Sequence, residues 1–294
     1  MKKIFYLIIG LALLTSCEKE VNIDLPQPDS KLVVEGWIEN GEYPVVIVSR
    51  NSSYFAPIDS SYLMDSLFIT DALVIVSDGI QNDTLQLQFD FGALQNSAWP
   101  IIYYKGSKIL GTEHGSYSLH IEAEGEVITG HTTIPGFVGF DSVWWEAENG
   151  TGDSLGYIHA YVSDNASEKN YYRIFSRRLG RDYNFIPVME SVYDDVFFNG
   201  LTFEYEIMRG EMSYENEEMM YEDPEFGYYT LGDTVIVKLS SIDREHYEFW
   251  RTLEEDVMAG GNPFTNPVTI RHNVEGAIGV FGGYGSVCDT LIIQ

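Results

Sequence analysis

The sequence predicts a mainly β protein with two antiparallel β-sandwich-like domains, the first immunoglobulin-like, and one amphipathic helix in the second. Short runs rich in β-branched and aromatic residues recur along the chain and are separated by turn residues. Only one segment, near residue 250, shows the apolar spacing of a helix. Strands at this spacing without intervening helices are typical of antiparallel sandwiches.

The N-terminus has the three-part pattern of a secretory signal. Lys2 and Lys3 supply a positive start, residues 4–14 are almost wholly apolar, and residues 15–16 are small. The apolar run is too short to span a bilayer as a helix. "LTSC" resembles the lipobox of bacterial lipoproteins, whose cysteine becomes the lipidated first residue. The alternative is a chance cysteine after an ordinary signal. We predict a signal peptide at 1–16 and lipidation of Cys17.

Residues 17–30 are predicted to be an acidic tether behind the anchor. Pro26 and Pro28 lie in a stretch without periodicity, which favours an extended linker. Acidic residues beside the cysteine resemble the surface-export signals of Bacteroidota lipoproteins, which favours outward-facing display. Two of the 17 basic residues leave with the signal, so the mature chain has 15 against 45 acidic ones, a formal charge of −30. Such a surface repels nucleic acid and anionic headgroups.

The first sandwich is expected at residues 31–136. Its clearest unit is a hairpin with a turn at Glu124–Gly125, in which apolar and polar residues alternate. The apolar face carries Tyr117, Leu119 and Ile121, and the other face carries Ser118, His120 and Glu122. The remaining expected strands are "KLVVEGWIE", "YPVVIVSR", "ALVIVSDG", "DTLQLQFD" and "IIYYKG". Ile134–Pro135–Gly136 is the best domain boundary in the chain.

The second domain is expected at 137–294, with a helix at about 241–259. Ser240 and Asp243 fit a capping box, and Gly260–Gly261 with Pro263 would stop the helix. A stripe at near-helical spacing is predicted to pack in the core: Tyr247, Trp250, Leu253 and Val257. The expected strands are "DSVWWEAE", "LGYIHAYVSD", "NYYRIFSRRLG" and "DTVIVKLSS". Cys288 has no intramolecular partner once Cys17 is lipidated, and we expect it to be a small buried residue.

An acidic, methionine-rich insertion is expected at about 204–225. The stretch from 203 to 227 holds nine acidic residues, four of the eight methionines, and Arg209 as its only base. It is either a solvated loop or a mobile contact surface, because methionine adapts to irregular partners. Copper capture by the thioethers is a further alternative. The candidate contact residues are Met208, Met212, Glu217, Glu218, Met219, Met220 and Tyr221. The densest supply of cations to balance the insertion is Arg173, Arg177, Arg178 and Arg181.

Catalytic templates are missing from the sequence. It contains no His-Glu-x-x-His and no paired Cys-x-x-Cys. Residues 152–156, Gly-Asp-Ser-Leu-Gly, match Gly-x-Ser-x-Gly in letters, but they lead into the strand-like run "LGYIHAYVSD" and not into the helix that a nucleophile elbow requires. His120 and Glu122 share a strand face, but a third metal ligand cannot be named. The glycines at 282, 283 and 285 lack the features of a phosphate loop and are expected to permit close packing. We therefore expect a protein that binds rather than catalyses, without a cofactor or metal.

The end of the chain carries a family resemblance. "GGNPFTNPVTIRHNVEGAIGVFGGYGSVCDTLII", the opening "KLVVEGWI" and "SYSLHIEAEGEVITGHTTIP" resemble a Bacteroidota lipoprotein family known as domain of unknown function 4249. The resemblance implies an outer-membrane lipoprotein, commonly encoded beside a TonB-dependent transporter, and implies no catalytic residues. We therefore expect an accessory protein of such a transporter, active in capture or uptake of a ligand. The alternative is a structural or adhesive surface lipoprotein.

Overall fold

The computed structural model of the protein describes residues 30–51, 67–96, 98, 100–148, 150, 154–210, 223–259 and 268–294. These residues all belong to one compact unit, which comprises 30–52 and 56–294. The fold is mainly β, as predicted. The expected signal peptide, Cys17 and nearly all of the tether lie outside the described residues.

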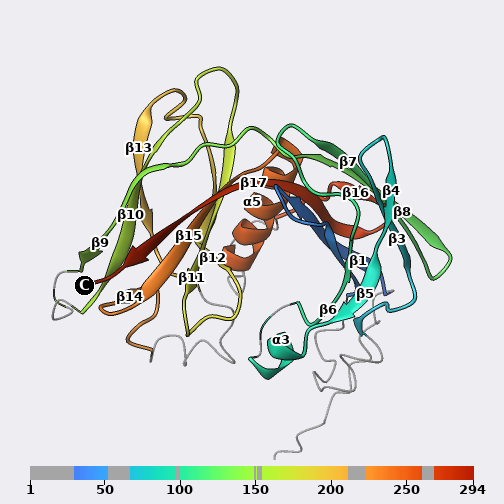
Figure 1. The fold of residues 1–294 in the computed structure, drawn as a ribbon, viewed down its shortest axis with the longest axis horizontal. Helices are drawn as coiled ribbons and strands as arrows, with labels where there is room; N and C mark the ends of the chain where they lie inside the picture. Colours follow the sequence, from blue (N-terminus) through green and yellow to red (C-terminus); the bar gives the residue numbers. More distant parts are fainter. Residues whose placement is uncertain are drawn as a thin grey trace, which may run out of the picture. The chain divides into compact units, whose positions relative to one another are not determined.

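An eight-stranded sheet forms the centre of this unit (Figure 1). Its strand order is β12-β11-β15-β17-β1-β2-β6-β5. The bounds are β1 (Leu32–Glu39), β2 (Val45–Arg50), β5 (Gln86–Phe89), β6 (Ile102–Lys105), β11 (Tyr171–Arg178), β12 (Ile186–Asp194), β15 (Thr234–Ser241) and β17 (Ile278–Ile292). The 15-residue β17, drawn in dark red, pairs with β1 over its first half and with β15 over its second half.

Two smaller sheets complete the described β-structure. A five-stranded sheet has the order β16-β8-β7-β3-β4, and in a four-stranded sheet β10 pairs with β9, β13 and β14. Their bounds are β3 (Leu73–Ser77), β4 (Asn82–Thr84), β7 (Ser116–Ala123), β8 (Glu126–Thr133), β9 (Phe140–Ala147), β10 (Leu155–Ser163), β13 (Thr202–Ile207), β14 (Tyr229–Thr230) and β16 (Val274–Glu275). The helices are α3 (Phe91–Gln95) and α5 (Arg244–Ala259). In the described part of the chain, no helix has the length and apolar character needed to cross a bilayer.

Each smaller sheet packs on part of the large sheet through its own apolar core. The first core joins Val34 of β1 to Leu119 of β7. The second joins Ile174 of β11 to Ala160 of β10. Two sandwich-like packings of this kind bury the apolar faces that the alternating pattern predicts. The predicted fold class is therefore confirmed.

Most strands of the first core precede Ile134–Pro135–Gly136, but β16 and the first half of β17, which also contribute to that core, follow it, and the large sheet continues across it. Residues from both expected domains, 31–136 and 137–294, share this sheet because β17 pairs with β1 on one side and β15 on the other. The β1–β17 pairing is also parallel, unlike the other strand pairings of the described residues. Sequence reasoning placed β17 in the second domain alone, since pairing between the ends of a chain leaves no local signal.

The hairpin at 116–133 forms as the sequence predicts. β7 pairs with β8 from Ser116↔Thr133 to Ala123↔Glu126. Both turn residues have positive φ, 53° at Glu124 and 83° at Gly125, which is the requirement of a type I′ turn. The apolar face of β7 is buried in the first core. On the other face, His120 Nε2 lies 3.1 Å from Glu122 Oε1.

Helix α5 forms where expected, but its cap and its buried face differ from the prediction. It begins at Arg244, and its N-cap is Asp243, whose Oδ1 accepts the His246 N–H at 2.9 Å. Ser240 remains in β15, 2.8 Å from Ser286 across hydroxyl oxygens. The buried residues of the helix are His246, Phe249 and Thr252. The predicted stripe is only partly buried, and Val257 is 71% exposed.

Glycines in β17 explain how α5 lies on the sheet. A Cβ on Gly282 would overlap the imidazole of His246, and a Cβ on Gly283 would overlap the carbonyl of Thr133. Glycine therefore lets the helix and the end of β8 approach β17 closely. The close-packing interpretation of these glycines is confirmed.

Two further expectations need correction. Cys288 is exposed, because β17 runs past the region that α5 covers before it reaches this residue. Residues 204–207 are not loop but part of β13, whose Tyr205 and Ile207 are buried in the second core. The alternation "EYEI" already has the period of a strand. The insertion therefore begins after Ile207.

Candidate functional site

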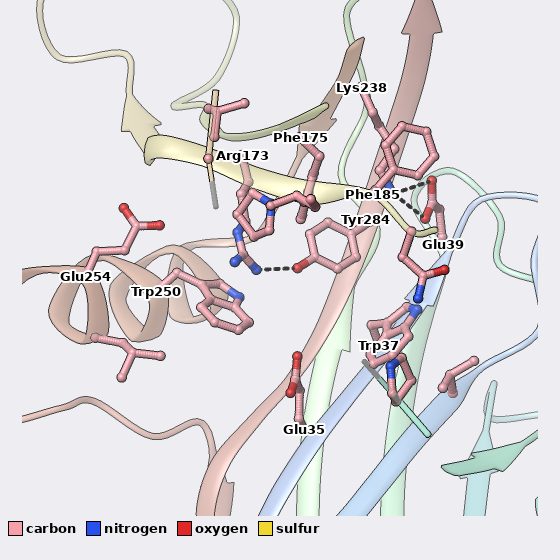
Figure 2. A pocket seen from close by; sticks show the side chains of 18 of the residues that line it. Glu35, Trp37, Glu39, Arg173, Phe175, Phe185, Lys238, Trp250, Glu254 and Tyr284 are labelled. Atoms are coloured by element: carbon pink, nitrogen blue, oxygen red, sulfur yellow. Dashed lines mark hydrogen bonds and ion pairs between the residues drawn. The ribbon is translucent and has the colours of Figure 1, made fainter. Parts of the chain in front are cut away.

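A cavity of about 860 Å³ opens on the large sheet beside α5. Alternation along the strands positions its lining. Glu35, Trp37 and Glu39 lie on the face of β1 opposite the first core, and Arg173 and Phe175 lie on the face of β11 opposite the second core. Because these residues share one cavity, both cores lie on the other face of the sheet. Figure 2 shows the side chains converging from β1, β11, β15, β17 and α5.

Aromatic rings form much of the cavity wall. The rings come from β1, β6, β11, β17, α5 and the segment before β12: Trp37, Tyr103, Phe175, Phe185, Trp250 and Tyr284. Phe175 and Tyr284 meet edge to face with centroids 5.7 Å apart. Rings of this kind give an organic ligand a large apolar contact area with a defined geometry.

Lys238 of β15 is a buried cation whose charge is balanced. It is 9% exposed, and its Nζ lies 3.1 Å from Glu39 Oε2. The ammonium also lies 4.8 Å from the centroid of Phe175 and 4.6 Å from that of Phe185. A carboxylate and two ring faces therefore hold this side chain in place.

Arg173 of β11 is a buried cation held mainly by neutral groups. It is 4% exposed. Its Nη1 donates to the Tyr284 hydroxyl at 2.8 Å, and its Nε donates to Ser191 Oγ at 3.2 Å. The guanidinium lies 3.5 Å from the centroid of Trp250. No carboxylate of the described residues lies within ion-pair distance of it.

The carboxylate of Glu254 contacts Arg173 only indirectly, through the Ser191 hydroxyl. Ser191 Oγ donates to Glu254, which also accepts the Ser191 backbone N–H at 3.1 Å. Glu254 therefore ties α5 to β12 and, through the Ser191 hydroxyl, reaches Arg173. Burial raises the pKa of Tyr284, although the Arg173 charge opposes this, so the phenol stays protonated.

His246 is a buried, neutral side chain that lies behind two residues of the cavity wall, Tyr284 and Trp250. Its ring centroid lies 4.6 Å from that of Tyr284 and 6.4 Å from that of Trp250. Burial lowers the pKa of His246 to about 4, with the Arg173 charge acting in the same direction and Asp243 opposing it. Its Nδ1 and the Trp250 Nε1 are buried without a hydrogen-bond partner among the described residues.

The cavity lining combines charged side chains of both signs with the aromatic wall. Five lining carboxylates, those of Glu35, Glu39, Asp90, Glu190 and Glu254, face three cations, those of Lys105, Arg173 and Lys238. Among the described lining residues there is no serine, threonine, cysteine or histidine to act as a nucleophile or its base. No group of three metal-ligating side chains gathers anywhere in the described residues. The arrangement can enclose an organic molecule and orient its polar group.

A family model described as "Domain of unknown function (DUF4249)" matches residues 18–288, which include every residue of the cavity. The chain belongs to the DUF4249 family. No curated protein matches it. The family description specifies neither a ligand nor a reaction, so both must be inferred from the site.

The cavity of this DUF4249 chain uses some residues that the sequence singled out for other reasons. Trp250, Leu253 and Val257 of the helical stripe line it, and so does Arg173 of the arginine cluster. Sequence reasoning missed Trp37, Tyr284 and Lys238. A signal was present in "TVIVKLSS", where one lysine interrupts an apolar strand. A lone charge at such a position indicates either a wet sheet face or a polar site.

The other arginines of the cluster lie away from the cavity. Arg178 and Asp182 form an ion pair at 2.8 Å, and Arg181 contacts both Asp233 and Glu225. Glu225 also lies 3.7 Å from Arg178. The C-terminal end of the acidic insertion therefore contacts arginines of this cluster, as its charge suggested.

The candidate contact residues of the insertion lie mostly outside the described residues. Met208 is half-buried, and its carbonyl accepts the Met189 N–H at 3.1 Å. Arg209 is buried, and its guanidinium donates to the carbonyls of Tyr228 and Glu225, each at 2.6 Å. Six of the candidate residues fall in the stretch that is not described: Met212, Glu217, Glu218, Met219, Met220 and Tyr221. Their role as a partner surface stays a prediction.

Proposed function

We propose that this protein is a lipid-anchored outer-membrane binding protein that captures an organic ligand and works with a TonB-dependent transporter in its uptake. The cavity on the large sheet supports the capture step. Its volume of about 860 Å³ lies within the range of small-molecule sites, and it combines an aromatic wall with a few converging polar groups. Catalysis is no part of the proposal.

The proposed position at the membrane rests on the N-terminal sequence. Lipidation of Cys17 would anchor the chain, since two or more acyl chains hold stably in a bilayer. The acidic stretch up to residue 29 would separate the anchor from the described unit, which begins at Ser30. The same stretch favours the outward face of the outer membrane of a Bacteroidota cell.

A second candidate function is adhesion at the cell surface without a transport role. Trp144, His159 and Tyr161 form an aromatic patch on the outer face of the four-stranded sheet. The Trp144 ring lies 5.4 Å from His159 and 5.0 Å from Tyr161, and Tyr161 is 41% exposed. Exposed aromatic residues of this kind are common at interfaces. The patch lacks the enclosure of the cavity, so the capture function is preferred.

The transport partnership is tested by co-purification. The tagged, lipidated protein is extracted from outer membranes in mild detergent, and its partners are identified by mass spectrometry. A stoichiometric TonB-dependent transporter is the expected result. Recovery of the chain without any such transporter, also after crosslinking in cells, would support the adhesive alternative.

The capture step is tested on the same material by native mass spectrometry. A bound organic molecule should add a discrete mass to the wild type. Val257→Trp places bulk at the cavity and should remove that mass. Asp256→Trp is the matched control, because Asp256 is exposed on the same helix and does not line the cavity. Equal occupancy in both variants would contradict the proposed site.

A further inference from the structure

We propose that Arg173 is the recognition point for a singly charged organic anion whose apolar body lies along the aromatic wall of the cavity. This inference rests on the proposed function, since it names the ligand class of the same site. It starts from the contrast between the two buried cations. Lys238 has Glu39 at 3.1 Å, whereas Arg173 has a hydroxyl, a phenol and two aromatic rings.

The hydrogen-bond donors of Arg173 are only partly used. A guanidinium carries five N–H groups, and this one donates through Nε and Nη1. Its Nη2 donates to no described residue. A buried guanidinium prefers a carboxylate, phosphate or sulfonate that accepts two parallel N–H bonds. An anionic group of a ligand would complete these contacts.

Two neighbouring groups can add donors to the same anion. The Tyr284 hydroxyl accepts from Arg173 and keeps its own proton for donation, since its pKa is raised by burial. The buried Nε1 of Trp250 has no partner among the described residues, and Figure 2 shows it on the side of the ring toward Tyr284. Three donor-bearing side chains, from β11, β17 and α5, therefore lie together, since Arg173 contacts both the Tyr284 hydroxyl and the Trp250 ring.

The rest of the lining sets the limits of the ligand. Glu35, Glu190 and Glu254 are three of five lining carboxylates and would repel additional negative charge, which disfavours polyanions such as nucleoside triphosphates. A cationic ligand is disfavoured as well, because Arg173 already lies over the rings of Phe175 and Trp250, and Lys238 over those of Phe175 and Phe185. A single anionic group on an apolar body satisfies both limits.

The test compares two dyes that share an aromatic body and differ in charge. 1-Anilinonaphthalene-8-sulfonate is a monoanion, and N-phenyl-1-naphthylamine lacks the sulfonate. Binding is measured by fluorescence titration of mature chain 17–294 carrying Cys17→Ala, so that no lipid or detergent takes up dye. This chain retains the whole compact unit from Ser30 onward. The wild-type cavity should bind the anionic dye at least about tenfold more tightly, as expected for a charge-assisted hydrogen bond.

Substitutions assign that preference to one residue. Arg173→Met should reduce the ratio of the two dissociation constants to about 1 while the neutral dye still binds. Arg173→Lys keeps the charge without the planar fork and should retain an intermediate preference. Arg244→Met is the matched control. The Arg244 side chain is 70% exposed and does not line the cavity, and its loss changes the net charge by the same amount as the loss of Arg173. Near-UV circular dichroism checks the fold of each variant, since partly folded chains also bind the anionic dye.

The outcomes separate this inference from the proposed function. Equal affinity of the wild type for both dyes would overturn anion recognition and leave capture in the cavity standing. An unchanged preference in folded Arg173→Met would do the same. Binding of neither dye to the folded wild type would overturn both proposals. If Arg173→Met fails to fold, the wild-type ratio and Arg173→Lys decide the question.

Discussion

Replacement of Asp243 by alanine should destabilise the protein strongly, because this carboxylate fixes α5 to the sheet. Its Oδ1 caps the helix at the His246 N–H. Its Oδ2 accepts the Thr132 hydroxyl at 2.6 Å and the Thr133 N–H at 3.1 Å. Thr132 Oγ1 in turn accepts the Gly283 N–H at 2.7 Å. One side chain therefore joins α5, β8 and β17.

The expected cost follows from these three contacts. Loss of an N-cap costs about 1 kcal/mol. Each hydrogen bond to a charged acceptor contributes about 1.5–3 kcal/mol, and the lower value suits this half-buried carboxylate. The sum predicts that Asp243→Ala lowers the free energy of unfolding by about 3–5 kcal/mol. Asp243→Asn retains one acceptor oxygen and should cost about half as much.

Urea unfolding followed by tryptophan fluorescence measures this difference. Asp256→Ala is the matched control on the same helix, since Asp256 is exposed, and it should stay within about 0.5 kcal/mol of the wild type. A cost of Asp243→Ala below about 1 kcal/mol would refute the reasoning. It would mean that the contacts of α5 with the sheet do not depend on this carboxylate.

His246, Gly282 and Cys17 each have a testable effect. His246 is neutral when folded and has a pKa of about 4, so its contribution to stability is present above pH 6.5 and is lost as pH falls toward 4. Between pH 7 and pH 5 the wild type should lose about 2 kcal/mol more unfolding free energy than His246→Gln. Gly282→Ala should cost about 1–3 kcal/mol in the same assay through overlap with His246, whereas Gly139→Ala, whose new Cβ would lie 3.9 Å from its nearest neighbour, should cost little. Cys17→Ala should release the protein from the membrane fraction, and retention there would show that Cys17 is not the anchor.

Local patterns predicted the local structure of this protein well. The hairpin at 116–133 could be predicted because alternation defined its faces and Glu124–Gly125 suited the turn. Helix α5 could be predicted to exist because its apolar spacing and stop residues agree. Its buried face could not, since the residues that pack on the sheet include His246 and Thr252, which carry no apolar signal.

The candidate site could not be predicted, because pairing between strands that are far apart in the sequence brings its residues together. Arg173 and Tyr284 lie 111 positions apart and come together because β15 pairs with both β11 and β17. Trp37 joins them only through the parallel pairing of β1 with β17. The same pairings place one aromatic stripe of α5 over a cavity instead of a core. Periodicity identifies such a stripe but does not reveal what lies opposite it.

The acidity of the chain and the buried Arg173 together determine how an anionic ligand could be held. A formal charge of −28 repels an anion in solution, and this repulsion is screened beyond about 10 Å at 0.1 M salt. Affinity must therefore come largely from the apolar body, whose contact with Trp37, Phe185 and Trp250 is insensitive to that charge. Arg173 then mainly orients the ligand and selects for its charge, because its hydrogen bonds favour a single anionic group at one position.

Since Trp250 and Glu254 both belong to α5, a partner that moved this helix would loosen the aromatic wall and the Ser191 link to Arg173 together. Such a coupling would allow a tightly held ligand to be released to a transporter without any chemical step.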